Sequence, residues 1–128
     1  MTAPAVKVVT DISRSVALKA VGRIAERWGL GKPELARVLG MLPARTVRDW
    51  FERDRNEPLP HDVVERISHL IGIYDGLHRL FGDDAYADRW IAIKNEAFGS
   101  REPRELLLSG SFTALVDIRR YVERALQQ

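Results

Sequence analysis

The 128-residue sequence contains no cysteine. Without thiols the chain cannot form a disulfide framework, a cysteine nucleophile, a zinc finger or a cysteine-ligated iron–sulfur site. Long apolar runs are also missing, since none approaches the ~20 residues that a membrane-spanning helix needs. Residues 1–10 lack the basic start and the apolar centre of a secretory signal peptide. Together these absences predict a cytoplasmic protein.

Composition and charge are those of an ordinary globular domain. Hydrophobic residues make up 45% of the chain and charged residues 30%, and this length suits one domain or two small subdomains that share a core. The net charge is +2. Residues 1–60 carry 11 basic and 7 acidic side chains, whereas residues 61–128 carry 9 and 11. A basic front half favours a polyanionic partner, although an asymmetry this small decides nothing alone.

Apolar residues recur at helical spacing along nearly the whole chain, and no segment alternates as a strand does. The sequence therefore predicts an all-α fold. Asp62 stands where an N-cap would begin the longest helix, with Glu65 at the capping-box position. The expected helices cover residues 12–28, 33–39, 43–52, 62–81, 84–94, 103–110 and 111–125, and residues 53–60 form a linker.

The second and third expected helices form a helix-turn-helix over residues 32–50. Ala36 is small enough to let these two helices cross closely, and Gly40 permits the sharp turn. Val47 and Trp50 anchor the third helix and leave its opposite face free. An N-terminal helix-turn-helix bundle is thus the first part of the predicted architecture.

The free face of the third helix carries the candidate DNA-binding residues. Arginine can fork onto guanine, and both arginine and threonine can hold phosphates. Three acidic residues, Asp49, Glu52 and Asp54, oppose the phosphates, so a single copy should bind weakly and need a dimer or a partner. The alternative is that these are solvated charges on an ordinary short helix. The candidate DNA-binding residues are Arg45, Thr46, Arg48 and Asp49.

The expected helix over residues 62–81 has an apolar stripe broader than one small neighbour would cover. One interpretation makes this helix the spine of the core. The other gives part of it to a homodimer seam. The two interpretations are compatible.

No enzyme signature is present. The chain has no glycine-rich phosphate loop, no G-x-S-x-G and no H-E-x-x-H. Its histidines share no metal-ligand spacing and are interpreted as surface or partly buried, and its clustered aspartates lie where a helix N-terminus favours acids. We predict no catalytic residue, no metal and no cofactor. The histidines are His61, His69 and His78, and the aspartates are Asp83, Asp84 and Asp88.

The C-terminal third carries an ordered pattern of Trp90, Asn95, Pro103, Leu107 and Gly110, followed by an apolar helix. Trp90 is expected to anchor its helix to the core, and Asn95 to cap backbone groups in a bend. Pro103 begins, and Gly110 ends, a helix too short to be stable alone. Following a helix-turn-helix, the pattern resembles the Xre–MbcA–ParS antitoxin family over residues 32–128.

The resemblance implies a domain organisation and a function. Residues 1–60 would be an Xre-like helix-turn-helix, residues 61–83 a connecting and dimerising helix, and residues 84–128 a small helical toxin-binding subdomain. Such a protein is the antitoxin of a type II toxin–antitoxin system. It neutralises an NAD-consuming toxin of the RES-domain type by covering its active-site entrance, and it represses its own operon. The implied toxin-binding residues are Trp90, Asn95, Pro103 and Leu107.

The last helix adds a cationic group that consists of Arg119, Arg120 and Arg124. These side chains either enter a toxin pocket that is built for dinucleotide phosphates or are solvated charges. The predicted partners are a RES-domain toxin, operator DNA and a second copy of the chain. A second hypothesis remains open: a helix-turn-helix transcriptional regulator whose C-terminal helices serve only dimerisation or effector binding.

Overall fold

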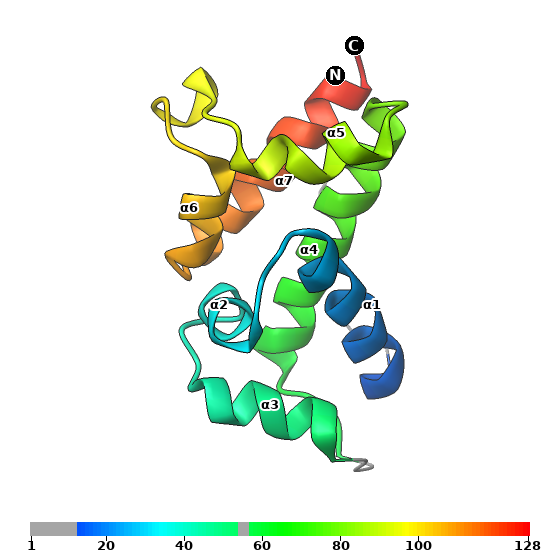
Figure 1. The fold of residues 1–128 in the computed structure, drawn as a ribbon, viewed down its shortest axis with the longest axis vertical. Helices are drawn as coiled ribbons and strands as arrows, with labels where there is room; N and C mark the ends of the chain where they lie inside the picture. Colours follow the sequence, from blue (N-terminus) through cyan, green and yellow to red (C-terminus); the bar gives the residue numbers. More distant parts are fainter. Residues whose placement is uncertain (1–12, 54–56) are drawn as a thin grey trace.

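The computed structural model describes residues 13–53 and 57–128, and helices dominate both ranges (Figure 1). The only β-type pairing within them is one antiparallel bridge between Asn95 and Arg101. The predicted all-α fold is confirmed. None of the helices in these ranges has the length and apolar character needed to cross a membrane. The elements are α1 (Arg14–Arg27), α2 (Lys32–Val38), α3 (Ala44–Glu52), α4 (His61–Leu80), α5 (Asp84–Arg89), η1 (Trp90–Ala92), η2 (Glu96–Phe98), α6 (Pro103–Leu108) and α7 (Phe112–Leu126).

Helix α4 is the spine of the molecule. Its first turns pack among the N-terminal helices, and its last turns lie beside α5 and α7 (Figure 1). Both α1 and α7 contact it along its length. Most of its apolar stripe is therefore buried within the chain, as expected for the spine of the core, while Ile71, Tyr74 and Phe81 are only partly buried. The buried residues of α4 are Val63, Val64, Ile67, Ser68, His69, Leu70, Ile73, Gly76 and Leu77.

Two glycines on α4 allow α7 to pack unusually close. A Cβ atom added to Gly76 would lie 2.5 Å from Cγ1 of Val122, and one added to Gly72 would lie 2.4 Å from Nε of Arg119. Real Cβ atoms do not approach neighbours so closely. Helix α7 can therefore lie this near to α4 only because positions 72 and 76 are glycines. The four-residue interval places both glycines on one face of α4.

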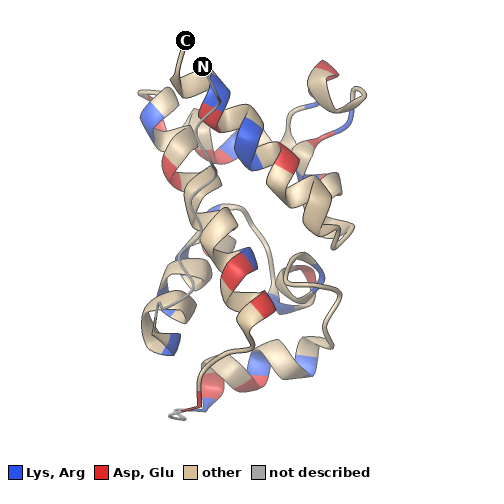
Figure 2. Ribbon diagram, turned by 180° about the vertical axis from the view of Figure 1, so that it is seen from behind, with Lys and Arg blue, Asp and Glu red and all other residues tan. Residues whose placement is uncertain are grey.

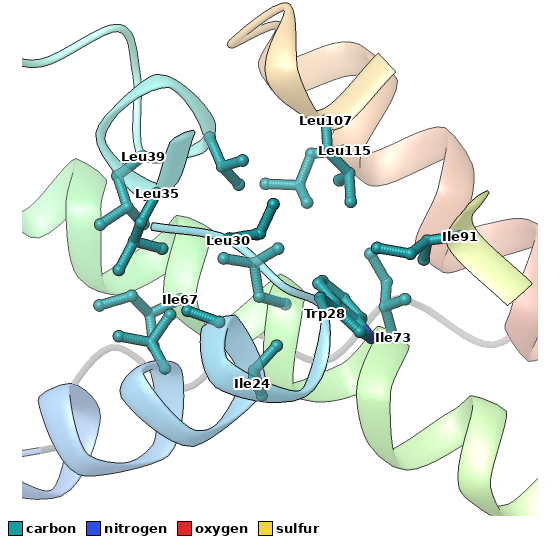
Figure 3. Packing of buried hydrophobic residues seen from close by; sticks show 14 of the residues in the cluster. Ile24, Trp28, Leu30, Leu35, Leu39, Ile67, Ile73, Ile91, Leu107 and Leu115 are labelled. Carbon is teal, nitrogen blue, oxygen red and sulfur yellow. The ribbon is translucent and has the colours of Figure 1, made fainter. Parts of the chain in front are cut away.

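One hydrophobic cluster extends through both halves of the chain (Figure 3). Leu35 and Leu39 enter it from α2, and Ile67 and Ile73 from α4. The C-terminal half contributes Ile91, Leu107 and Leu115. Because this core is continuous, the two halves support each other.

Three local expectations are wrong. The N-cap of α4 is Pro60 rather than Asp62, and its side chain makes no capping bond. Asp62 lies in the first turn instead, where its carboxylate accepts a 3.1 Å hydrogen bond from Nε of Arg66. The helix expected to reach residue 94 ends at Arg89, because the tighter η1 turn lets two consecutive residues, Trp90 and Ile91, face the core.

The third wrong expectation concerns the first helix. Val16 stands at helical spacing with the apolar residues Ala20 and Ile24, which predicts that it is buried, yet it is 54% exposed. Ala17 and Leu18 supply the buried contacts there instead. The expected start of this helix at Ile12 lies outside the described residues.

We predict that Gly76→Ala lowers the free energy of unfolding by about 1–2 kcal/mol. The added methyl group would overpack the contact with Val122, which outweighs the gain of about 1 kcal/mol in helix propensity. Chemical denaturation measures the loss. Gly82→Ala is the matched control, since nothing lies within 4 Å of its added Cβ. Val122→Ala in the same chain should relieve the clash, so additive losses in the double variant would contradict the prediction.

Candidate functional site

Helix α3 is anchored by its inner face, as the sequence predicted. Val47 is fully buried, while Trp50 and Phe51 are half-buried and pack against the core. The turn before α3 uses left-handed backbone at Gly40, with φ of 117°, and at Met41, with φ of 59°. These contacts fix α3 and leave its other face toward solvent.

The C-terminal end of α3 is held by α1. The guanidinium of Arg14 donates to the carbonyls of Trp50, Arg53 and Glu57 at 3.2–3.4 Å. A cation at this position satisfies carbonyls that the helix leaves unpaired and complements its dipole. The N-terminal end has no side-chain cap, because Pro43 stands at that position.

The outer face of α3 carries the predicted DNA-binding residues together. Arg45 and Arg48 are exposed, and Thr46 is half-buried. Arg45, Thr46, Asp49 and Arg53 line a shallow hollow of about 350 Å³. Along this helix the basic residues Arg45 and Arg48 come first, and the acidic residues Asp49 and Glu52 follow (Figure 2).

An ion pair offsets one of the acids on this face. Asp49 Oδ1 lies 2.8 Å from Nε of Arg53, one helical turn away. The pair reduces the repulsion that Asp49 would exert on a phosphate. Glu52 is exposed, and Asp54 lies outside the described residues.

The second candidate surface is built on an aromatic cluster in the C-terminal half. Trp90 stacks on Tyr121 at a centroid distance of 5.9 Å, and Phe98 meets Trp90 and Tyr121 edge-on at 6.4 and 5.2 Å. Trp90 is only 7% exposed. It anchors its segment to the core, as the sequence predicted.

Asn95 organises the loop between η1 and α6. Its side-chain Oδ1 accepts a 2.9 Å hydrogen bond from the backbone amide of Ala97. Its backbone amide donates to the carbonyl of Arg101 at 3.1 Å. The expected capping role of Asn95 is confirmed. The loop closes through left-handed backbone at Gly99 and Ser100, with φ of 67° and 59°.

The expected toxin-binding residues divide into two groups. Trp90, Pro103 and Leu107 are buried and shape the subdomain from inside, and Asn95 is half-buried. Arg120 and Arg124 on α7 are exposed. These two arginines are therefore the most accessible members of the set.

Arg119 corrects the expectation that all three arginines of α7 face outward. It is 7% exposed. Its Nη1 lies 3.4 Å from both the carbonyl of Ser68 and Nδ1 of His69, and its Nε donates to Glu123 at 3.2 Å. The Gly72 surface gives the guanidinium room to lie against α4. Arg119 therefore joins α7 to α4 and does not project toward a partner.

Sequence reasoning missed a hollow beside the aromatic cluster. It measures about 400 Å³, and Phe98, Arg101, Leu106 and Asp117 contribute to its lining. Ile93, on the same loop, is 42% exposed. The available signal was the break in helical periodicity after residue 92, which marks a loop held out from the bundle.

Two histidines have opposite environments. His69 is 2% exposed, more buried than expected, and burial together with the charge of Arg119 lowers its pKa. The ring nitrogens of His78 lie 3.0 Å from Asp84 Oδ1 and 2.8 Å from Asp88 Oδ1. Burial alone would lower the pKa of His78, but the hydrogen bonds and charges of these carboxylates outweigh it, so the pKa is raised. Within residues 13–53 and 57–128, no cluster of three or more His, Asp or Glu side chains is arranged to hold a metal ion.

The architecture defines a helix-turn-helix protein with a second helical bundle attached through α4. Two family models match it: the antitoxin Xre-like helix-turn-helix domain over residues 7–72, and the antitoxin Xre/MbcA/ParS C-terminal toxin-binding domain over residues 77–126. The chain belongs to this antitoxin family. It is thus an antitoxin with a toxin as its protein partner, and family membership indicates a regulator rather than an enzyme. An uncharacterised protein of Sinorhizobium fredii, y4oB, is 32% identical over 106 residues, which cover 83% of this chain and 81% of y4oB.

We predict that His78 makes the protein less stable as the pH rises above about 6.5, the value of an unperturbed histidine. The folded state holds the proton more tightly than the unfolded state, so this contribution is complete below the unfolded pKa and is lost as the pH passes through the raised folded pKa. Denaturant unfolding from pH 5 to 9 measures it. Two further side chains face this site. Nη1 of Arg27 lies 3.8 Å from Oδ2 of Asp88, and the ring of Tyr74 lies 4.3 Å from the His78 ring, centroid to centroid.

His78→Gln is the comparison variant for this prediction. It retains one donor and one acceptor but cannot carry the charge. The stability difference between the wild-type chain and His78→Gln should be largest at low pH and should shrink as the pH rises. A difference that does not change with pH would contradict the assigned protonation.

Proposed function

We propose that this protein neutralises a RES-type, NAD-degrading toxin by covering the entrance of its active site, and that it represses its own operon through α3. The observation that carries the proposal is the toxin-binding domain match over residues 77–126, on a chain that also has a helix-turn-helix. In this proposal residues 84–128 contact the toxin, residues 1–60 contact DNA and residues 61–83 connect them. The cytoplasm is the compartment that suits both partners.

The exposed cations of α7 are the side chains that would contact the toxin in this proposal. A pocket that holds the two phosphates of NAD is itself cationic and would repel arginine, so these side chains would contact acidic or carbonyl groups at the rim of the entrance. Arg120 and Arg124 lie at consecutive turns of one exposed helical face. They therefore suit an entrance that carries carboxylates or carbonyls around the phosphate pocket.

We predict that Arg120→Ala combined with Arg124→Ala weakens inhibition of the toxin at least ten-fold. Each charge-assisted hydrogen bond contributes about 1.5–3 kcal/mol, and 1.4 kcal/mol corresponds to a factor of ten. The measurement is NAD hydrolysis by a RES-domain protein encoded beside this gene, titrated with the antitoxin. Arg23→Ala combined with Arg79→Ala, at exposed positions on α1 and α4, is the charge-matched control.

Point substitutions are needed for this test. Deleting residues 84–128 would remove Leu115, Ile118 and Val122 from the shared core, so the remainder would lose its fold as well as its toxin site. Unchanged inhibition by the double variant would remove Arg120 and Arg124 from the interface. No inhibition by the wild-type protein would refute the RES assignment itself.

We predict that Arg45→Ala and Arg48→Ala each weaken binding to a duplex taken from the region upstream of this gene. A lost phosphate contact also makes the dependence of log K on log salt less steep by about 1. Fluorescence anisotropy at several salt concentrations measures both effects. Arg23→Ala on α1 removes an exposed charge elsewhere and serves as the control. Equal losses in all three variants would indicate a general charge effect rather than a site on α3.

The second candidate keeps the antitoxin fold but assigns the C-terminal helices to dimerisation or effector binding rather than to a RES toxin. The open hollow beside Phe98 is the feature that favours it, because a small effector would need such a recess. This second candidate would be supported if the protein binds operator DNA but does not inhibit NAD hydrolysis by any RES-domain protein.

A further inference from the structure

The turn between α2 and α3 rests directly on the loop between α6 and α7. Gly110 in that loop has φ of 76°, and a Cβ added there would lie 2.6 Å from Cγ of Met41 and 3.0 Å from the carbonyl oxygen of Arg37. No side chain fits between the two segments. The turn that introduces α3 and the loop that introduces α7 are thus in van der Waals contact, although about 70 residues separate them in the sequence.

Two arginines join the same segments by hydrogen bonds. Nη1 of Arg66 on α4 donates to the carbonyl of Gly110 at 2.8 Å and lies 3.4 Å from the carbonyl of Val38. Nε of Arg37 donates to the carbonyl of Leu108 at 3.0 Å. We call Arg37, Met41, Arg66 and Gly110 the junction.

Arg66 is positioned to act as the centre of the junction. Its side chain is only 11% exposed, with Asp62 bound to its Nε at 3.1 Å and the ring of Phe112 5.5 Å from its Cζ. The carbonyls of Val38 and Gly110 lie at the ends of α2 and α6, where helices leave carbonyls unpaired. A single guanidinium therefore connects the helix-turn-helix to the C-terminal half.

The backbone of Met41 shows what the junction holds in place. A φ of 59° is a conformation that non-glycine residues seldom adopt, at a cost of about 1–2 kcal/mol. Met41 is 58% exposed, so little surrounds its side chain apart from the Gly110 contact. Only Leu42 and Pro43 separate Met41 from the first residue of α3. A change of the Met41 φ angle to a more common value would therefore reorient the helix that carries Arg45 and Arg48.

We propose that Arg66 and Gly110 are positioning residues for DNA binding, which act through Met41 to fix the orientation of α3. The inference rests on the proposed DNA-binding role of α3 and deepens it, since it places part of the DNA-binding apparatus in the C-terminal half. A partner that clamps the α6–α7 loop would favour the orientation of α3 seen here. By linkage, DNA bound to α3 would strengthen the binding of that partner equally.

The first test follows α3 without any ligand. Arg66→Met keeps the apolar contact with Phe112 but removes the donors to Val38 and Gly110. Amide hydrogen exchange across residues 41–52 should then accelerate at least five-fold, and Arg66→Lys, which retains one charged donor, should give a smaller acceleration. Gly76→Ala weakens the α4–α7 contact away from the junction and controls for general destabilisation. Wild-type exchange over residues 41–52 in Arg66→Met would overturn the proposal.

The second test measures binding to the upstream duplex by fluorescence anisotropy. Arg66→Met should bind at least ten-fold more weakly than the wild-type chain, whereas Gly76→Ala should keep wild-type affinity at a temperature where both variants are folded. Equal weakening in the two variants would overturn the positioning role. If exchange accelerates as expected but the wild-type chain binds no upstream DNA, the proposed DNA function fails while the control of α3 by the junction stands.

Discussion

The close approach of α7 to α4 is the constraint on which the rest of the structure depends. It exists because Gly72 and Gly76 present bare backbone to Arg119 and Val122. With α7 this near, Leu115 and Ile118 reach the same core that α1 and α2 fill from the other end. One long helix can then organise both a helix-turn-helix and a second bundle without a separate core for each.

Within this shared core lie several residues of the family pattern, among them Trp90 and Leu107. A partner would therefore meet other residues on the surface. Trp90 and Leu107 hold the C-terminal half in shape, and Asn95 closes the loop beside them. The accessible groups are the arginines of α7 and the edge of the loop with Ile93. In this chain the buried positions of the family pattern thus serve folding, and the exposed positions are the ones left for contact with a partner.

Much of the fold could be predicted from the sequence, because helical periodicity and the Gly and Pro positions are local signals. They located the helix-turn-helix, the long α4 and the closing α7. The end of α5 could not be predicted, since it depends on Trp90 and Ile91 both finding space in the core. The burial of Arg119 depends on Gly72, 47 positions earlier in the chain, and no local pattern links the two. The exposed face of α3 could be predicted, because once the apolar residues of a helix are assigned to the core, its opposite face must lie toward solvent. The hollow at Phe98 could not, because it is formed by residues of the loop together with residues of α7.

The continuous core also affects how the protein would be lost from a cell. A chain whose halves fold separately can be trimmed by a protease to leave one half working. Here a cut that releases α7 removes Leu115, Ile118 and Val122 from contact with α4, so the helix-turn-helix loses its support in the same event. A single cleavage would thus end the proposed toxin neutralisation and the proposed DNA binding together.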